Sequence, residues 1–398
     1  MSKRRVLIIA TTFPRWKGDR EPRFILDFAK SLLPYADVTV LVPSSPGSLD
    51  REVMEGVNIE RFHYFPIHER ETLTAPGALV SRIKQDKKRG LLLPFFYNAF
   101  VNEIKKRIGT FDILHANWVI PGGYIAYKAL KMTNVPYVIT CHGSDINSMN
   151  NLVFRDMKKK ALSNAWGVTA VSSELMDNTC KIYNNGNNAV ISMGVDVNQF
   201  GEQHRRENYF KQNGRKVALF VGRLTEVKGA AYAIEAMQYV PDTRLVITGD
   251  GELRKELKSL AAELKNKLRD INSDVVFAGA KTHDELKTMY ASADAFIMPS
   301  VTAKSGQKEG FGLVLIEAAG SKLPIVASNS GGIPTLIKDG ENGLLVEERD
   351  ARGISEALKK IFNDSDLRDK LKENAYNTAL EYDYSVIGRK YAEFMRLI

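Results

Sequence analysis

The sequence predicts an α/β protein built from two successive doubly wound, Rossmann-like domains. At 398 residues the chain exceeds the size at which a single core usually stops growing. Short apolar or β-branched runs alternate with amphipathic segments of helix length, which is the pattern of a parallel sheet. This alternation breaks once, over residues 184–214, and then restarts. One domain on each side of the break accounts for all three observations.

Each predicted strand is a short apolar run. Before the break the runs lie at residues 6–11, 38–43, 113–118, 137–143 and 167–173. After it they lie at residues 217–222, 245–249, 275–279, 295–300, 324–328 and 343–347. We therefore expect an N-terminal domain at 1–195 and a C-terminal domain at 196–381, whose strand ends line a central cleft.

The two ends of the chain are also predicted. The start, MSKRRVLIIATTFP, has a basic region like that of a signal peptide, but its apolar run is short and leads into a charged segment. It is interpreted as a first strand. Residues 382–398 are predicted to form an amphipathic helix that either ends the second domain or crosses back onto the first.

The composition is that of a globular protein, with 44% apolar and 26% charged residues. Cys141 and Cys180 are the only cysteines, too few for a disulfide framework or a cysteine zinc site. No uninterrupted apolar run approaches eighteen residues, so no membrane span is predicted. A cytoplasmic location is expected.

The stretch EGFGLVLIEAAG (309–320) is the first candidate for chemistry. Gly310 and Gly312 precede a helix predicted to start near residue 312, whose first N–H groups suit phosphate or sugar oxygens. Glu309 lies before that helix and Glu317 more than one turn into it, so the two acids could flank one ligand. The alternative is a capped helix with two solvated glutamates.

Two cations follow the first strand of the second domain. In VGRLTEVKG, Arg223 and Lys228 suit a diphosphate and would stabilise charge on a departing nucleotide. A pair of surface cations in a turn is the alternative. Gly249 and Gly251 bracket another strand end, and SGG (330–332) follows a third; these could let a ligand approach the backbone or could be turn glycines only.

In this order and spacing, GRLTEVKG, ITGDGE, EGFGLVLIEAAGSKLPIVAS, SGG and DGENGLLV resemble the donor domain of the retaining GT-B glycosyltransferases of family 4. The resemblance extends into the first half through HGSD (142–145), AVSS (170–173) and GVDVNQF (194–200). FPRWKGDREPRF (13–24) and HANWVIPGG (115–123) are similar to members that build bacterial exopolysaccharides and lipopolysaccharides. The resemblance implies the GT-B fold.

The resemblance also implies roles for matching residues. Glu309 and His142 are implied at the donor sugar, Arg223 and Lys228 at the diphosphate, and Glu317 at the ribose hydroxyls. The remaining implied donor contacts are backbone groups, at Gly18, Gly249, Gly310, Phe311, Gly312 and Leu313. Gly18 departs from the common form, which has two adjacent glycines, and its N–H could meet either phosphate or acceptor.

Acceptor contacts are less defined. Asp145 could bind an acceptor hydroxyl or cap a helix. His115 and Asn117, at the end of the strand ILHANW, could contact the acceptor or pack at the strand end. The 301–308 loop, longer than in many relatives, could reach over the ligands or be a tolerated surface insertion.

The first 200 residues carry 26 Lys and Arg against 18 Asp and Glu. Within them, residues 81–107 set an apolar and aromatic stretch between two KKR runs, and FRDMKKKAL (154–162) adds further cations. An anionic membrane surface is therefore a candidate partner, with peripheral attachment to the inner face of the plasma membrane. The alternative is a helix whose apolar face joins the core. Nucleic acid is not expected, because no binding motif appears.

The function implied is transfer of a hexose or N-acetylhexosamine from a nucleotide diphosphate sugar to a glycan or lipid-linked acceptor. A UDP-sugar is favoured, with GDP-mannose next. No cofactor or metal is expected, since the only Asp-x-Asp, at 364–366, is interpreted as a helix-capping turn.

The alternatives are a nucleotide-sugar epimerase or phosphorylase of the same architecture, or an inactive nucleotide-sugar-binding protein. A dinucleotide oxidoreductase is disfavoured, because TTFPRWKGD follows the first strand in place of G-x-G-x-x-G.

Overall fold

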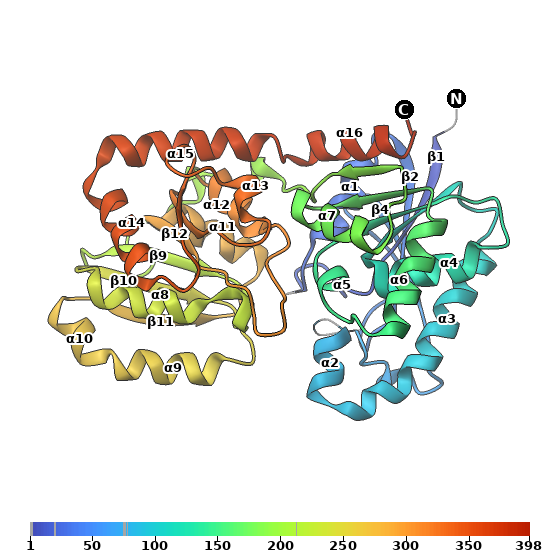
Figure 1. Ribbon diagram of the computed structural model, residues 1–398, viewed down its shortest axis with the longest axis horizontal. Coiled ribbons are helices and arrows are strands. Elements are labelled where there is room, and N and C mark those ends of the chain that lie inside the picture. Colours follow the sequence, from blue (N-terminus) through green and yellow to red (C-terminus); the bar gives the residue numbers. More distant parts are fainter. Residues whose placement is uncertain (1–2, 20, 75–76, 78, 212) are drawn as a thin grey trace. The chain divides into compact units, whose positions relative to one another are not determined.

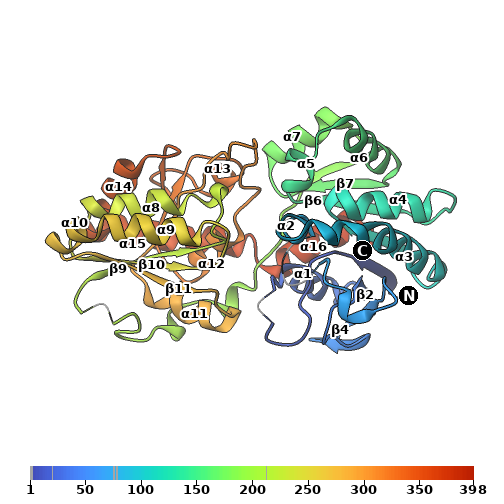
Figure 2. The same ribbon diagram turned by 90° about the horizontal axis from the view of Figure 1, so that it is seen from below.

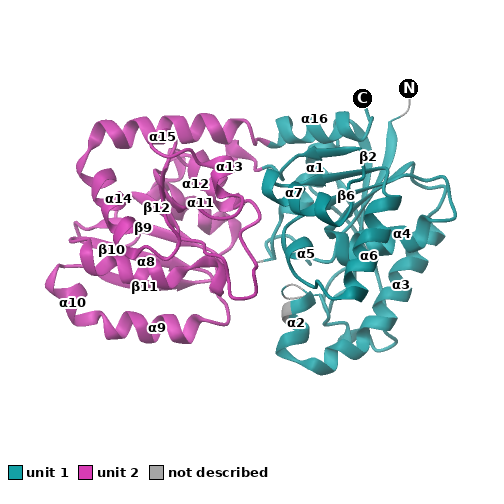
Figure 3. Cartoon of the chain, viewed as in Figure 1, with its two compact units in different colours: residues 1–194, 384–398 teal, residues 195–383 magenta. Residues whose placement is uncertain are grey.

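The computed structural model describes residues 3–19, 21–74, 77, 79–211 and 213–398. The chain divides into two compact units (Figure 3): unit 1 is residues 1–194 with 384–398, and unit 2 is residues 195–383. Each unit contains one sheet with helices packed on it (Figure 1). The prediction of two parallel-sheet α/β domains is confirmed.

The sheet of unit 1 has the strand order β3-β4-β2-β1-β5-β6-β7-β8. All neighbours are parallel except β3 and β4. Its strands are β1 (Arg4–Ile9), β2 (Ala36–Pro43), β3 (Arg51–Met54), β4 (Val57–Phe62), β5 (Ile113–Asn117), β6 (Tyr137–Cys141), β7 (Gly167–Ala170) and β8 (Asn188–Val190). Five of these are the strands predicted for the first half.

Three strands of unit 1 were not predicted. β3 and β4 form a hairpin whose two loop residues, Glu55 (φ 51°) and Gly56 (φ 88°), both have the left-handed backbone that such tight turns require. β8 lies inside the segment predicted as a linker, and this part of the prediction is wrong. The Asn side chains that resembled linker composition hydrogen-bond to backbone carbonyls: Asn185 to those of Leu162 and Ala165, and Asn187 to that of Trp166.

The helices of unit 1 are α1 (Phe24–Leu32), α2 (Leu79–Gln85), α3 (Leu93–Lys106), α4 (Tyr124–Leu130), α5 (Ser144–Asn147), α6 (Leu152–Asn164), α7 (Ser173–Ile182) and α16 (Tyr384–Phe394). α16 follows unit 2 in sequence but packs on α1. Gly388 permits this contact, since a Cβ there would lie 2.3 Å from the carbonyl oxygen of Ser31. The C-terminal helix therefore crosses back to unit 1.

Unit 2 has a six-stranded parallel sheet of order β11-β10-β9-β12-β13-β14. Its strands are β9 (Lys216–Val221), β10 (Thr243–Thr248), β11 (Asp274–Gly279), β12 (Ala295–Met298), β13 (Ile325–Ser328) and β14 (Leu344–Val346), all six of which the sequence predicts. Its helices are α8 (Ala230–Ala236), α9 (Arg254–Glu263), α10 (Lys265–Asp270), α11 (His283–Ser292), α12 (Leu313–Gly320), α13 (Ile333–Leu336), α14 (Ala351–Asn363) and α15 (Ser365–Leu380). Figure 2 shows α8 and α9 on one side of this sheet and α11 on the other.

Each sheet contains a point where the strand order reverses. In unit 1 the point lies between β1 and β5, and in unit 2 between β9 and β12. Doubly wound sheets bind ligands beyond the carboxyl ends of the strands at such a point, because the two connections leave in opposite directions and open a crevice. The loops after these four strands are therefore the expected place for ligand-binding side chains.

Candidate functional site

The loops after β9 and β12 are in direct backbone contact at the reversal point of unit 2. The N–H of Val301 donates to the carbonyl of Val227 at 2.8 Å. Gly229 (φ 63°) follows the short 3-10 turn η6 (Glu226–Lys228), and a Cβ at this position would lie 1.8 Å from the carbonyl oxygen of Pro299. Only glycine allows this approach, which brings Lys228 beside the segment that leads to Glu309.

Lys228 and Glu309 form an ion pair. The distance from Nζ of Lys228 to Oε2 of Glu309 is 2.5 Å, and the two side chains are only 18% and 12% exposed. Arg223 is exposed, and it has no ion pair with any residue that the structure describes. The structure thus brings two of the predicted residues together and leaves Arg223 facing solvent. A diphosphate would meet one unpaired guanidinium and one ammonium that must change partner.

The helix α12 begins with unused backbone donors. Gly312 (φ 89°) is its N-cap and supplies no side chain to cap the first turn. Within the described part of the chain, no hydrogen-bond acceptor faces the N–H groups of Gly310, Phe311, Gly312 or Leu313. The predicted helix start is confirmed to within one residue. Such free N–H groups at a helix N-terminus suit an anion or sugar hydroxyls.

The glycine pair after β13 holds the segment around Glu309 from the other side. A Cβ on Gly331 would lie 2.3 Å from the carbonyl oxygen of Glu309, and one on Gly332 would lie 2.1 Å from that of Gly310. The N–H of Gly332 also donates to the Glu309 carbonyl at 3.0 Å. These glycines therefore permit backbone packing that side chains would prevent.

The turns after β9 and β10 pack in the same way. Gly249 has a φ of 131°, and a Cβ there would lie 1.9 Å from the carbonyl oxygen of Gly222. The N–H of Leu224 donates to the carbonyl of Asp250 at 2.9 Å. Gly249 thus fixes the loop that carries Arg223, and this packing alone accounts for a glycine at that position.

Glu317 has a partner that the sequence did not reveal. The hydroxyl of Tyr290, on α11, donates to its Oε2 at 2.7 Å. Tyr290 is fully buried, and burial together with the neighbouring carboxylate raises the pKa of its hydroxyl well above the ordinary value. The phenol therefore stays protonated and orients the Glu317 carboxylate on α12.

The 301–308 loop is anchored to unit 2, chiefly by Glu348, a residue that sequence reasoning missed. The Glu348 carboxylate accepts from the N–H and hydroxyl of Thr302, at 2.8 and 2.7 Å, and from the hydroxyl of Ser330 at 2.5 Å. Burial alone would raise the pKa of this carboxyl, but the hydrogen bonds outweigh it and lower the pKa. Glu348 thus joins the loop to the glycine pair.

Aromatic rings surround His142, which follows β6, the strand next to β5 in the sheet of unit 1. The ring centroids of Trp118 and Phe24 lie 4.9 and 5.6 Å from that of His142. Trp118 has a φ of 65°, which is uncommon for a bulky residue. Burial lowers the pKa of His142 to about 3, so its imidazole is neutral near pH 7.

His115 and Asn117 are fully buried, and their hydrogen bonds are made inside unit 1. Asn117 binds the carbonyl of Ile9 and the ring of His142, while His115 binds the hydroxyl of Thr140. Neither side chain is presented to a ligand. Of the two alternatives that the sequence left open, the arrangement favours packing at the strand end over direct acceptor contact.

Asp145 is also enclosed, with 1% of its surface exposed. Its carboxylate accepts backbone N–H groups from Val119 at 2.7 Å, Gly143 at 2.9 Å and His142 at 3.1 Å. Burial raises its pKa even though these N–H groups act in the opposite direction. The carboxylate therefore connects the HGSD turn to the segment after β5, where it is enclosed and not presented to an acceptor. Asp145 does not cap a helix either, because the N-cap of α5 is Gly143 and no side chain caps that helix.

Gly18 lies at the tip of an exposed turn after β1. It has a φ of 82°, and the turn is closed by an ion pair between Arg15 and Asp19 at 2.7 Å. A Cβ on Gly18 would meet nothing within 4 Å, so backbone conformation alone requires glycine. Arg20, in the same predicted segment, lies outside the described residues.

The basic surface of unit 1 is smaller than the sequence suggested. Lys158, counted there among surface cations, is fully buried, and its ammonium donates to the carbonyls of Ile146 and Ser148 and to the side chain of Asn150. Arg107 is paired with Glu60 and Glu103. In α3, Phe96 and Phe100 join the core, whereas Leu91, Leu93 and Phe95 are 75%, 37% and 50% exposed. The segment has both a core face and an outward apolar face.

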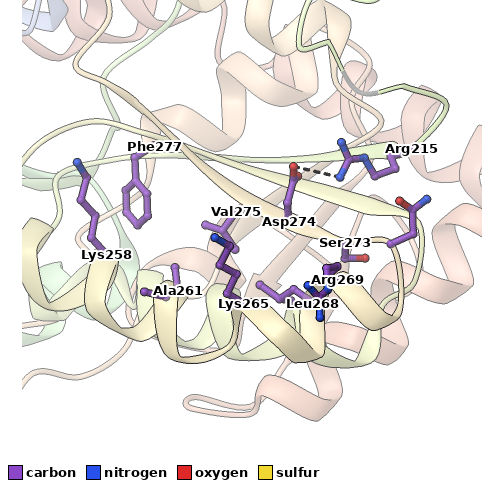
Figure 4. A pocket seen from close by; sticks show the side chains of 12 residues that line it. Arg215, Lys258, Ala261, Lys265, Leu268, Arg269, Ser273, Asp274, Val275 and Phe277 are labelled. Atoms are coloured by element: carbon purple, nitrogen blue, oxygen red, sulfur yellow. Dashed lines mark ion pairs between the residues drawn. The ribbon is translucent and has the colours of Figure 1, made fainter.

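A cavity of about 590 Å³ lies elsewhere in unit 2, between β11 and the helices α9 and α10 (Figure 4). Cations line it over an apolar floor, and Arg215 pairs with Asp274 at its end at 3.0 Å. Its lining is Arg215, Lys258, Ala261, Ala262, Lys265, Leu268, Arg269, Asn272, Ser273, Asp274, Val275 and Phe277. None of the predicted site residues belongs to it.

Metal-binding clusters and membrane-spanning helices are two further features that bear on function. Across the part of the chain that the structure describes, no cluster of His, Cys, Asp and Glu is arranged to hold a metal ion. Asp364 caps α15 by accepting from the N–H of Leu367 at 2.9 Å, which confirms the interpretation of residues 364–366. Among the helices described, none is both long enough and apolar enough to cross a membrane.

Comparison with known proteins identifies two family models in the chain. Residues 22–199 match Glycosyltransferase Family 4, and residues 201–378 match Glycosyl transferases group 1. A phosphatidyl-myo-inositol mannosyltransferase of Mycolicibacterium smegmatis is 30% identical, over 77% of this chain and 79% of its own length. A putative teichuronic acid biosynthesis glycosyltransferase of Bacillus subtilis is 25% identical, over 71% and 69% of the two chains.

The fold is shared with solved glycosyltransferase structures. The Anabaena protein HepE, crystallised with UDP and glucose, superposes with a TM-score of 0.74 at 20% identity. The match covers 99% of this chain and 100% of the Anabaena chain. The likeness extends over both units.

Proposed function

The chain belongs to the group 1 glycosyl transferases of family 4, and we propose that it moves a hexose or N-acetylhexosamine from a nucleotide diphosphate sugar to a growing surface glycan. A UDP-sugar is the favoured donor and GDP-mannose the next. The bound UDP and glucose of the Anabaena protein support the first choice. The Bacillus relative is named for teichuronic acid biosynthesis, which supports a surface glycan as the product. The mycobacterial relative is named a phosphatidyl-myo-inositol mannosyltransferase, which supports a lipid-linked acceptor.

The Lys228–Glu309 pair at the reversal point of unit 2 carries this proposal. A donor diphosphate offers Lys228 a second anionic partner, and Glu309 is then released to accept hydroxyl hydrogens of the sugar. Arg223 and the free N–H groups before α12 add positive charge where the nucleotide departs. With Lys228, Arg223 and these N–H groups around the diphosphate, no divalent metal would be needed to neutralise its charge.

We expect transfer with retention of configuration. The bond between the anomeric carbon and the phosphate oxygen breaks, and the acceptor oxygen bonds to that carbon on the same face. The acceptor proton passes to the leaving phosphate. Glu309 and His142 bind the sugar without forming a covalent bond to it, because none of these reaction steps needs a nucleophile from the protein.

Activity can be tested with purified protein, a bacterial lipid extract and a panel of labelled nucleotide sugars. We expect transfer from one donor, without added metal, and a product whose anomeric configuration matches that donor. A thermal-shift screen against UDP, GDP and ADP and their sugars identifies the base first. If no donor in the panel is transferred or hydrolysed, the proposal is wrong.

Glu309→Ala is the matched test of the site. It should abolish transfer while the protein stays folded, because Glu309 lies at the end of a loop and supports no core contact. The melting temperature should fall only by the effect of the lost ion pair with Lys228. Glu341→Ala, an exposed glutamate of the same unit, is the control and should transfer normally. Unchanged turnover by Glu309→Ala would remove this residue from the mechanism.

We further propose that the outward face of Leu91, Leu93 and Phe95 binds an anionic membrane surface, where a lipid-linked acceptor resides. Lys87 and Lys88, both exposed, lie beside it in the turn η2 (Lys87–Leu92), and cations near an anionic bilayer each contribute about 1 kcal/mol.

Vesicle flotation tests this surface. We expect the protein to float with phosphatidylglycerol vesicles and not with phosphatidylcholine alone. Leu91→Asp with Phe95→Asp should abolish flotation, whereas Met132→Asp, which changes an apolar side chain of unit 1 that is 87% exposed, should not. If the double variant and Met132→Asp float equally well, the face of Leu91, Leu93 and Phe95 is not the membrane-binding surface.

A further inference from the structure

We propose that the cavity between β11 and the helices α9 and α10 binds an extended acidic segment of a partner protein, which joins the unit 2 sheet as an added strand. This cavity, named the β11 groove here, has a volume of about 590 Å³ (Figure 4). Three features of unit 2 lead to this occupant: a strand edge without a neighbour, an apolar floor and a cationic rim. None of the three depends on the glycosyl transfer proposed above.

The strand edge belongs to β11, which pairs with β10 only on one side. Among the residues that the structure describes, the outward backbone groups of β11 have no hydrogen-bond partner. The strand contains no proline, and its one charged residue, Asp274, is held by Arg215 and Arg244 at 3.0 and 2.6 Å. Features that usually protect an edge from pairing are therefore missing. Only another extended backbone offers donors and acceptors at the same repeat along the strand.

The floor of the β11 groove is apolar and only partly covered. Val275 and Phe277 of β11 line it together with Ala261 of α9 and Leu268 of α10 (Figure 4). Val275 and Phe277 are half-buried, and Val276, on the other face of the strand, is 37% exposed. Apolar side chains thus remain accessible on both faces of an edge strand. An added strand would cover them on both faces at once.

The rim of the β11 groove is cationic. Lys258 of α9 and Lys265 and Arg269 of α10 line it and are exposed. Within the described part of the chain, none of the three has an ion pair. The ammonium of Lys258 lies 5.9 Å from the ring centroid of Phe277, which brings positive charge close to the floor. The matching side chain is apolar near its backbone and anionic at its tip, as glutamate is. The matching segment therefore alternates glutamate with apolar residues.

The β11 groove is separate from the proposed donor contacts of unit 2. Arg215 and Ser273, which line one end of it, directly precede β9 and β11. Lys228 and Glu309 instead follow the carboxyl ends of β9 and β12. All six strands of this sheet are parallel, so their amino and carboxyl ends lie on opposite sides of the unit. A partner in the groove would leave the loops of the proposed donor site uncovered.

Fluorescence anisotropy with the full-length protein tests the occupant. The probe is a labelled peptide of alternating glutamate and valine, of about eight residues, which is an ordinary strand length. We expect saturable binding that weakens as the salt concentration rises, because the cations of the rim are exposed. The same peptide with lysine in place of glutamate should not bind, and neither should a peptide N-methylated at each peptide bond. Failure of the first peptide to bind, or equal binding of the N-methylated one, would overturn the proposal.

Two double variants test the place of binding. Lys258→Glu with Lys265→Glu reverses one cation of the rim on each helix, and it should weaken peptide binding at least about tenfold, because attractions become repulsions. Lys255→Glu with Lys267→Glu is the matched control. It makes the same change of charge at exposed positions of the same two helices that do not line the groove. Equal affinities of the two folded variants would mean that net charge attracts the peptide, and the assignment to the groove would be wrong.

Hydrogen exchange of the complex tests strand addition itself. The bound peptide should slow amide exchange in residues 274–279, because the outward N–H groups of β11 gain acceptors, and leave β14, the opposite edge strand, unchanged. Unchanged exchange in residues 274–279 would overturn the added strand.

Sedimentation of the protein alone tests the other possible occupant, a second copy of this chain. We expect no self-association through the groove, because two copies would bring like-charged rims together. A dimer that dissociates in the Lys258→Glu, Lys265→Glu variant would show that a second copy fills the groove, and the acidic partner segment would be wrong.

Discussion

Lys228 is the residue whose charge the proposed chemistry needs most directly, because it is enclosed and has one carboxylate partner. Lys228→Met keeps the apolar stem and removes the ammonium. A hydrogen bond to a charged group contributes about 1.5 to 3 kcal/mol, so kcat/KM should fall roughly 10- to 150-fold. Lys255→Met, which removes an exposed ammonium from α9, is the control. Steady-state kinetics with the identified donor give kcat/KM for both variants. Equal values of kcat/KM for Lys228→Met and Lys255→Met would exclude Lys228 from donor binding.

Glu348 shows what residue types alone do not disclose. Glu309 and Lys228 could be predicted because each follows a strand end in a glycine-rich motif. Glu348 follows β14 in an ordinary charged run, and its role arises only because folding brings it to Thr302 and Ser330. Tyr290 is similar, since its position on α11 gave no sign that it would meet Glu317.

The lowered pKa of Glu348 leads to a prediction about pH. A carboxyl whose pKa is lower in the folded than in the unfolded protein stabilises the fold above the unfolded value, and this stabilisation is lost as the pH falls through the folded one. Glu348→Gln should therefore lower the free energy of unfolding by about 1 kcal/mol near pH 7.

Urea unfolding makes this measurement. The difference from wild type should shrink as the pH falls below the ordinary carboxyl pKa of 4.5, and it should vanish below the lower pKa of the folded protein, where both proteins lack the charge. Glu356→Gln, an exposed residue of α14, should match wild type throughout. A difference for Glu348→Gln that stays constant with pH would show that its charge is not what anchors the loop.

At the scale of elements, the loops of unit 2 hold one another through backbone contacts that only glycine permits. Gly331→Ala would place a Cβ 2.3 Å from the Glu309 carbonyl oxygen and displace the segment that carries Glu309. Gly340 is the matched control. Its φ of 70° is comparable to the 56° of Gly331, but a Cβ there would meet nothing within 4 Å.

Both alanine variants carry the cost of a left-handed backbone, roughly 1 kcal/mol. Only Gly331→Ala should also lose donor affinity, by tenfold or more if one hydrogen bond to the sugar is broken. Calorimetric titration with the donor separates strain from displacement. Equal donor affinities for Gly331→Ala and Gly340→Ala would mean that the contact between Gly331 and Glu309 does not affect donor binding.

Strands were predicted from sequence where they are continuous apolar runs. β4 is largely buried, but its apolar residues alternate with polar ones, and it was not predicted. All six strands of unit 2 are short apolar runs between helical segments, so their composition sufficed. β3 is exposed on alternate residues and β8 is only three residues long, so neither has an apolar run to detect. The ion pair of Lys228 with Glu309 depends on the contact between two loops 81 residues apart, which periodicity does not encode.

At the scale of the whole molecule, sequence order and structural units do not coincide. α16 lies after unit 2 in the chain, yet Tyr391 packs on Phe28 of α1 with ring centroids 4.7 Å apart. The Tyr391 hydroxyl also lies 3.2 Å from that of Thr140 on β6 and donates to the carbonyl of Ile191 at 3.1 Å. Sequence periodicity predicted the helix but not its destination, because an amphipathic helix fits either apolar surface.

This arrangement predicts an unusual response to truncation. Each unit has its own sheet and core, so calorimetry should resolve two unfolding transitions, and the identified donor should raise the melting temperature of unit 2, which holds the proposed diphosphate contacts. Deleting residues 384–398 removes Tyr391 and uncovers Phe28. Because several buried side chains are lost, the melting temperature of unit 1 should fall markedly.

The melting temperature of unit 2 should not change, although unit 2 is the part adjacent in sequence to the deleted helix. Tyr391→Phe should lower the melting temperature of unit 1 only slightly, because it keeps the ring and removes only the hydroxyl and its hydrogen bonds. A truncation that lowered the unit 2 transition instead would show that α16 stabilises its neighbour in sequence and not unit 1.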